Sequence, residues 1–131
     1  MNDLEKIIHI LSLSSLHKNH KIGDLRRLIL PPIRLKQYLL LVDPDKVFYA
    51  SWAFMSQEAS DAYEHQTRSL KAEDWNSGHI PWIIDIISPL GQTAQGIKEL
   101  KKIPRLLGVK GKIRFYRHKK GEKKIHHVTW L

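Results

Sequence analysis

Apolar residues at the start of the chain recur at the spacing of an amphipathic helix. One face of this helix carries Leu4, Ile7, Ile8 and Leu11. The pattern predicts a helix that ends near Leu13. A second helix is expected to start at Asp24, whose carboxylate suits the N-cap position. Pro31 and Pro32 should end or kink this second helix, because proline lacks a backbone N–H and disfavours a helical conformation at the preceding residue.

Strand-like runs dominate the rest of the chain. Residues 38–42 ("YLLLV") and 47–54 ("VFYASWAF") flank the turn residues 43–45, a pattern that predicts an antiparallel hairpin. The apolar run "WIIDIIS" at 82–88 lies between prolines and predicts a buried central strand. Polar and apolar residues then alternate on both sides of Lys120-Gly121, which predicts a terminal hairpin.

Helices are expected between these strands. Ser56 suits the N-cap of a helix that runs to about Arg68, and 70–81 is a loop by composition. Residues 92–107 form a basic amphipathic helix, which Pro104 can break. Its inward residues are Ile97, Leu100 and Ile103. The elements together predict an α+β fold with a mostly antiparallel central sheet and helices packed on it.

Length and composition indicate one domain over residues 1–131. The chain is 42% hydrophobic and has no cysteine, which excludes disulfide bonds and thiolate zinc ligands. No run reaches the about 20 apolar residues of a membrane span. The first ten residues lack the cationic start and long apolar run of a secretory signal. We therefore expect a soluble cytoplasmic protein with no stable membrane insertion.

The chain is strongly basic, with 22 Lys and Arg against 13 Asp and Glu and a net charge of +9. Such a field attracts acidic partners and speeds their association. Nucleic acid, an anionic membrane surface and an acidic protein would all be attracted, so charge does not choose among them. In the terminal hairpin, basic and aromatic residues interleave as in a nucleic-acid platform. The lysines of this alternative are Lys119, Lys120, Lys123 and Lys124.

Asp85 is the most informative single residue. It lies between isoleucines in an apolar strand, where a carboxylate is costly to bury without a partner. It therefore either faces an open cleft or pairs with a specific cation or donor, and both a functional and a structural role stay open. An aspartate that orients a histidine would satisfy this cost and create a catalytic base.

The segment "SSLHKNH" at 14–20 offers such a histidine. If the first helix continues, Ser14 and His17 lie on one face, three residues apart. The alternative is a serine that caps the helix and a histidine that meets the negative end of its dipole. His20 follows three residues after His17, but no nearby carboxylate supports a metal site, so no metal is expected. The other histidines are expected on the surface, in a loop or on the terminal hairpin.

Five segments in order carry a resemblance to a known family: "SSLHKNH", "LPPIRLKQYLLL", "YASWAFMS", "SLKAEDWNSG" and "WIIDIISPLG". From about Leu11 to Pro104, their order and spacing resemble those of the RTX toxin-activating lysine acyltransferases, the haemolysin-activating family. The most specific parts are the 72–78 segment and the pair of Trp82 with Asp85 three residues later.

The resemblance implies a fold like that of the Gcn5-related N-acetyltransferases. It implies an enzyme that moves a fatty acyl chain from acyl carrier protein to the ε-amino group of internal lysines in an RTX protoxin. The family's essential histidine matches His17, as general base or acyl acceptor, its important aspartate matches Asp85, and a serine of less defined role matches Ser14. No bound cofactor is implied, because the acylated carrier protein is the donor. Its acidity would explain the basic charge without nucleic acid, and a homodimer is also implied.

The chain departs from the family pattern near the expected site. His20 stands where the family tends to have tryptophan, Ser15 replaces a proline and Ile86 replaces a frequent tryptophan, which should change the shape of the acyl channel. Beyond Pro104 the resemblance fades. Candidates for an arginine of the family's C-terminal part are Arg114 and Arg117. An inactive relative that only binds carrier protein stays an alternative, as does the nucleic-acid-binding module.

Overall fold

The computed structural model describes residues 2–15, 17–107, 112–119 and 122–129, and from residue 107 onward it describes side chains only at 113–115. Its elements in chain order are α1 (Asp3–Leu13), α2 (Ile22–Leu28), α3 (Leu30–Leu35), β1 (Tyr38–Asp43), β2 (Lys46–Met55), α4 (Gln57–His65), the 3-10 helix η1 (Ala72–Trp75), β3 (Ile80–Ile87), α5 (Thr93–Leu100), α6 (Pro104–Leu107), β4 (Lys112–Lys119) and β5 (Glu122–Thr129).

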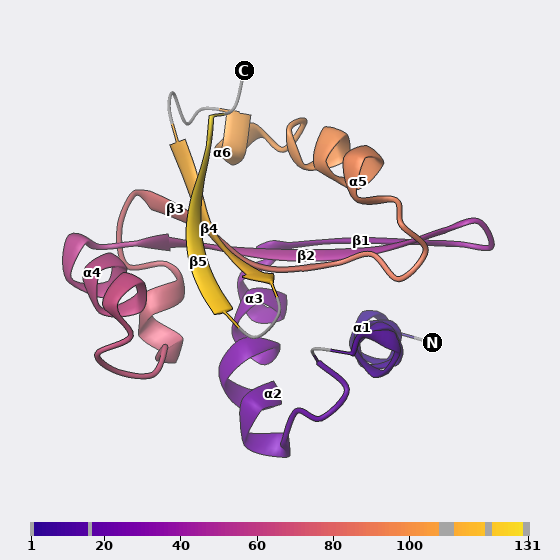
Figure 1. Cartoon of the computed structure of the whole chain (residues 1–131), viewed down its shortest axis with the longest axis horizontal. Coiled ribbons are helices and arrows are strands. Elements are labelled where there is room, and N and C mark those ends of the chain that lie inside the picture. The colour runs from indigo at the N-terminus through magenta and orange to yellow at the C-terminus, as the bar shows by residue number, and fades with distance from the viewer. Residues whose placement is uncertain (1, 16, 108–111, 120–121, 130–131) are drawn as a thin grey trace.

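The strands form one sheet in the order β1-β2-β3-β4-β5, so that β3 is central (Figure 1). Every neighbouring pair is antiparallel except β3 and β4, which are parallel. The predicted α+β class, the hairpin of β1 and β2, the central strand and the terminal hairpin are therefore confirmed. The closer likeness to Gcn5-related acetyltransferases stays a prediction.

Helices cover both faces of the sheet. Helices α1, α2 and α3 lie on one side of β1 and β2, and α5 and α6 lie on the other (Figure 1). Side chains alternate along β2, as a pleated strand requires. The α5 and α6 side has a core that contains Phe48, Ala50, Trp52, Phe54, Ile83, Leu100, Leu106 and Ile113. The opposite side buries Ile7, Ile10, Leu11 and Ile29 against Tyr49 and Ile87.

Several predicted boundaries were wrong for identifiable reasons. Helix α2 begins at Ile22, and Asp24 is not its N-cap but accepts a hydrogen bond from the Lys21 N–H at 2.8 Å. The second helix does end beside the two prolines, as expected: α2 stops at Leu28, and the prolines lie in the first turn of α3, where a missing N–H breaks no helical bond. Helix α4 stops at His65, since Gln66 adopts a left-handed conformation.

Two more elements differ from the expected pattern. The predicted 70–81 loop contains η1, and the predicted helix over 92–107 is divided into α5 and α6. The residues expected to face inward do so: Leu100 is buried, and Ile97 and Ile103 pack against the same core.

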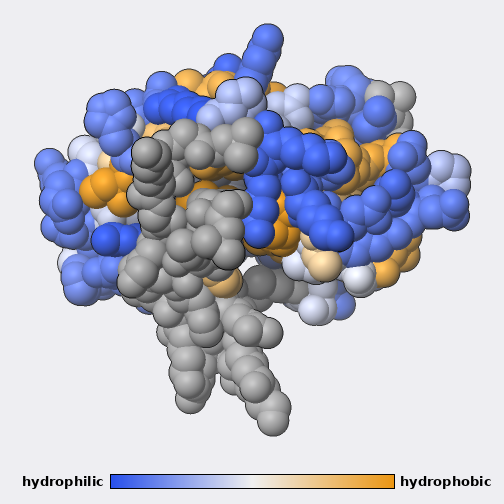
Figure 2. All heavy atoms as spheres, turned by 90° about the horizontal axis from the view of Figure 1, so that it is seen from above, coloured by the Kyte–Doolittle hydropathy of each residue, from blue (hydrophilic) through white to orange (hydrophobic). Residues whose placement is uncertain are grey.

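Hydrophilic side chains predominate on the face formed by α5 and α6 (Figure 2). The cations of these helices are Lys98, Lys101, Lys102 and Arg105. None of the helices in the described part of the chain is long and apolar enough to cross a membrane.

Candidate active site

His17 lies in the short connection between α1 and α2. Helix α1 is docked through its buried apolar face, which fixes where this connection starts. The chain then turns tightly: the His17 N–H donates to the Ser14 carbonyl at 3.1 Å, and the His20 N–H donates to the His17 carbonyl at 3.0 Å. These turns hold the His17 side chain against the sheet, where the residue is only 7% exposed.

The structure brings Ser14, His17 and Asp85 together. Ser14 Oγ lies 2.7 Å from His17 Nδ1, and His17 Nε2 lies 2.9 Å from Asp85 Oδ1. The Asp85 side chain is 11% exposed, so the contact between His17 and Asp85 is shielded from water. With Asp85 as a carboxylate and His17 as a neutral imidazole, Nε2 carries the proton and Nδ1 accepts the Ser14 hydroxyl proton, because a carboxylate only accepts hydrogen bonds.

A β-bulge turns Asp85 toward His17. In the pairing of β2 with β3, Ser51 lies opposite Asp85 and Trp52 lies opposite Ile83, which leaves Ile84 without a counterpart. A bulge of this kind adds one residue and changes which face the following side chains point to. Ile83 therefore packs toward α5, whereas Ile84 and Asp85 both line a pocket on the opposite side.

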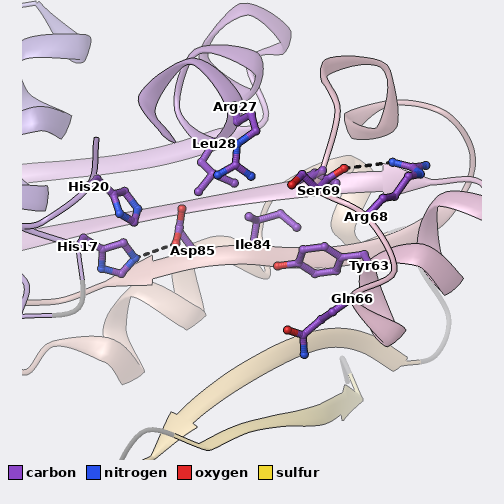
Figure 3. Close-up of a pocket in the computed structure, with 11 residues that line it drawn as sticks. His17, His20, Arg27, Leu28, Tyr63, Gln66, Arg68, Ser69, Ile84 and Asp85 are labelled. Carbon is purple, nitrogen blue, oxygen red and sulfur yellow. Dashed lines mark hydrogen bonds and ion pairs between the residues drawn. The ribbon is translucent and has the colours of Figure 1, made fainter. Parts of the chain in front are cut away.

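The pocket has a volume of about 530 Å³ and extends along β3 between α2 and α4 (Figure 3). Its described lining residues are His17, His20, Arg27, Leu28, Tyr63, Gln66, Arg68, Ser69, Leu70, Ile84 and Asp85. His17, His20 and Asp85 lie at one end, and Gln66, Arg68 and Ser69 lie at the other (Figure 3). Ser14 supports His17 from outside this lining.

Both arginines of the pocket have carboxylate partners. Arg27 Nη2 lies 2.8 Å from Asp24 Oδ1, and Arg68 binds Asp74 through two contacts of 2.6 and 3.0 Å. Burial opposes ionisation of Asp74, but the Arg68 guanidinium and the Lys71 backbone N–H outweigh it and lower the pKa of that carboxyl. Asp85 also lines the pocket, but among the described residues it has no arginine partner.

The other predicted residues fall into three groups. His20 lines the pocket, whereas His9, His65 and His79 are exposed. Arg114 lies on β4, where it donates to Ser60 Oγ at 3.1 Å and lies 3.7 Å from a Glu64 carboxylate oxygen. Outside the described side chains are Arg117, His118, Lys119, Lys120, Lys123, Lys124, His126 and His127.

Sequence reasoning missed Tyr49 and Ser51, which lie on β2 beside Asp85. Both are completely buried, and each has a side-chain oxygen without a hydrogen-bond partner among the described residues. Alternation places the two on one face, but the sequence does not say that this face meets Asp85. The described residues contain no group of three metal-ligating side chains.

Comparison with known proteins identifies the family. The model of the HlyC, RTX toxin acyltransferase family matches residues 2–131, well beyond the 11–104 range of the resemblance. The RTX-II toxin-activating lysine-acyltransferase ApxIIC of Actinobacillus pleuropneumoniae is 37% identical over 126 residues, which cover 95% of this chain and 78% of ApxIIC.

Other relatives are matched over less of their length. The protein-lysine myristoyltransferase RtxC of Kingella kingae is 35% identical over 78% of this chain and 62% of RtxC. The protein-lysine myristoyltransferase HlyC of Escherichia coli is 41% identical over 68% of this chain and 52% of HlyC. The match to this family covers nearly every residue of the chain, which therefore belongs to the RTX toxin acyltransferase family.

Proposed function

We propose that this chain is a protein-lysine acyltransferase, which moves a fatty acyl group from acyl carrier protein to the ε-amino group of an internal lysine in an RTX-type protoxin. Its relatives support the reaction, since ApxIIC is named a toxin-activating lysine-acyltransferase and RtxC and HlyC are named protein-lysine myristoyltransferases. The observation that carries the proposal is the shielded contact of His17 with Asp85 at the end of a pocket.

The reaction needs a group that takes a proton from lysine. A lysine with a pKa near 10.4 is mostly protonated at neutral pH, and an ammonium group has no lone pair to attack a thioester. Once the proton is removed, the amine nitrogen bonds to the thioester carbonyl carbon. The carbon–sulfur bond then breaks, and the leaving thiolate takes up a proton. The products are an amide and the free thiol of the carrier.

In this proposal His17 is the general base and Asp85 orients it. Asp85 holds the Nε2–H and stabilises the imidazolium that forms when Nδ1 takes a proton. At rest the Ser14 hydroxyl donates to Nδ1, so it must release that nitrogen before His17 can accept a proton. Ser14 is thus a positioning residue. A covalent alternative, in which His17 accepts the acyl group before lysine does, uses the same atoms.

The carrier protein is expected to approach from the side of the pocket. Lys18 and Arg26 are exposed there, on the segment that holds His17 and on α2. Opposite charges on two proteins raise the rate of encounter and fix their orientation. A homodimer and a cytoplasmic location, which the resemblance also implies, stay predictions; sedimentation tests the first.

Intact-mass measurement of a protoxin fragment, incubated with the chain and acylated carrier protein, tests the function. We expect a mass increase of one acyl chain per modified lysine. His17→Ala and Asp85→Asn should each lower the transfer rate by about 10²–10⁴-fold, the usual contribution of general acid–base catalysis. His79→Ala, which removes an exposed histidine, is the control.

Two results would contradict the proposal. If the wild-type chain bound carrier protein but transferred no acyl group in a single turnover, it would be an inactive relative. If His17→Ala kept full activity while folding normally, the catalytic assignment would be wrong.

A further inference from the structure

Four buried side-chain atoms in the described part of the chain have no hydrogen-bond partner, and one of them belongs to Asp85. These atoms are Asp85 Oδ2, Ser51 Oγ, the Tyr49 hydroxyl oxygen and His20 Nε2. Ser51 lies directly opposite Asp85 in the strand register, so their side chains are neighbours on one face. Unpartnered buried polar atoms are rare and costly, and a group of them indicates a place that a polar ligand completes.

The four atoms form two pairs, according to whether their residues line the pocket. Tyr49 and Ser51 are 0% exposed and do not line the pocket, so a ligand in the pocket does not reach them. Burial, together with the charge of Asp85, raises the pKa of Tyr49, which therefore stays a neutral phenol. Asp85 and His20 do line the pocket; their free atoms are buried under its lining, so a ligand reaches them when either side chain turns slightly.

The two residues that carry these atoms lie at the same end of the pocket (Figure 3). His17 is hydrogen-bonded to Asp85 Oδ1, and the other carboxylate oxygen of Asp85 points toward the side where His20 lies (Figure 3). The His20 ring packs edge-on against the His17 ring, with 5.3 Å between their centres and 70° between their planes. His17 has both ring nitrogens occupied by hydrogen bonds, whereas His20 keeps Nε2 free.

The chemistry of these atoms favours a cation with several N–H donors. Asp85 Oδ2 only accepts hydrogen bonds, and His20 Nε2 accepts when its proton is on Nδ1. The arginines of the pocket are compensated by Asp24 and Asp74, so they do not cancel the charge of Asp85. A primary ammonium group has three donors and no acceptor, which matches this pair of acceptors.

We propose that His20 Nε2 and Asp85 Oδ2 together bind the ε-ammonium group of the substrate lysine. This inference rests on the proposed function and makes it more specific. It places the substrate nitrogen on the Asp85 side of His17, as a binding position that precedes transfer of the proton to His17 Nδ1. It also gives His20, which the sequence suggested only as part of the wall, a direct contact with the substrate.

Binding of n-butylamine, whose ammonium form mimics a lysine side chain, tests the site without requiring turnover. Titration of the full chain, followed by NMR of the histidine ring protons, should give a saturable shift at His20. His20→Phe should weaken binding about tenfold, because a hydrogen bond to a charged group is lost. His20→Gln, which supplies an amide oxygen, should bind within about threefold of wild type, and His79→Phe should bind as wild type does.

The kinetic test separates this inference from the proposed function. With a lysine peptide as acceptor, His20→Phe should raise KM about tenfold and change kcat much less. If butylammonium binds at His20 while the wild-type chain transfers no acyl group, the function fails and the ammonium site stands. The site is overturned if His20→Phe and Asp85→Asn bind butylammonium as tightly as wild type, or if butanol, which has no charge, shifts His20 equally well.

Discussion

Asp74 shows how one residue stabilises the wall of the pocket. Asp74 is 4% exposed, and its carboxylate accepts hydrogen bonds from the Arg68 guanidinium and the Lys71 backbone N–H. Through Arg68 this carboxylate holds the segment that follows α4, which forms one end of the pocket. Removing one partner of a buried ion pair is far more costly than removing both, because the remaining charge is left unpaired.

Because the Arg68 side chain keeps partial contact with water, Asp74→Asn should lower the free energy of unfolding at pH 7 by only about 1 kcal/mol. The folded state lowers the pKa of Asp74, so its stabilising contribution is complete above the unfolded pKa of about 3.9 and is lost as pH falls through the lower, folded value. Urea denaturation of both proteins between pH 7 and pH 3 measures this. The difference between them should shrink below about pH 4. A difference independent of pH would indicate that packing, not charge, is lost.

At the residue scale, the sequence predicted local spacing better than distant contacts. Ser14 and His17 are three positions apart, and the sequence placed them on one face if the first helix continued. The helix ends at Leu13, and a tight turn brings the two side chains together instead. The bond from His17 to Asp85 joins residues 68 positions apart, so periodicity could suggest the partnership but not show it. The free nitrogen of His20 could not be predicted, because it depends on what surrounds the ring.

At the scale of elements, Gly78 is where the loop after η1 meets β2 most closely. The N–H groups of Ser77 and Gly78 donate to the Phe54 carbonyl at 2.8 and 3.1 Å. A Cβ atom at Gly78 would lie 2.5 Å from the Met55 carbonyl oxygen, and this neighbour is backbone that cannot move away as a flexible side chain can.

Gly78→Ala should consequently lower the free energy of unfolding by about 1–3 kcal/mol, the usual cost of overpacking. Gly23→Ala is the matched control, because a Cβ at Gly23 meets nothing within 4 Å and alanine favours the helix that contains it. Thermal denaturation of the two variants measures the effect. Equal midpoints for both would show that the loop can shift at little cost.

Element types were predicted well, and their ends less well. Ser56 was correctly placed as the N-cap of α4, because a serine before a helical pattern accepts a backbone N–H locally. The end of that helix depends on a left-handed residue that is not glycine, Gln66, and nothing in the pattern indicates it. The start of α2 was misplaced because an aspartate satisfies the first turn equally well from inside the helix.

At the scale of the whole molecule, the basic charge is spread over both faces. Exposed cations lie on the segment that holds His17 and on α2, at Lys18 and Arg26, and also on α5 and the turn after it, at Lys98 and Lys102. Hydrophilic side chains predominate on the face of α5 and α6 (Figure 2). Total charge alone therefore does not say where an acidic partner docks. Under the proposed function the position of the pocket does, because the acyl group would have to reach His17 and Asp85.

The double change Lys18→Glu and Arg26→Glu should raise KM for the acylated carrier protein about tenfold and reduce its dependence on salt. The matched control, Lys98→Glu with Lys102→Glu, alters net charge equally on the far side of the sheet. Steady-state rates at two salt concentrations measure both. An equal rise of KM in the two proteins would mean that only net charge matters and that the proposed approach is wrong.

The overall topology was predictable in outline. Two hairpins and a central strand follow from the pattern, but the parallel pairing of β3 with β4 does not, because it depends on how α5 and α6 carry the chain over the sheet.

The extra residue in β3 divides that strand into two halves, in which odd-numbered and even-numbered side chains face opposite sides of the sheet. Ile80 and Trp82 face the side that Asp85 and Ile87 also face, although the first two numbers are even and the last two are odd. The orientation of Asp85 thus depends on how many residues precede it, not only on what they are. In β3, replacing one isoleucine with another apolar residue leaves Asp85 facing the pocket. Adding or removing a single residue would turn Asp85 to the other face of the sheet.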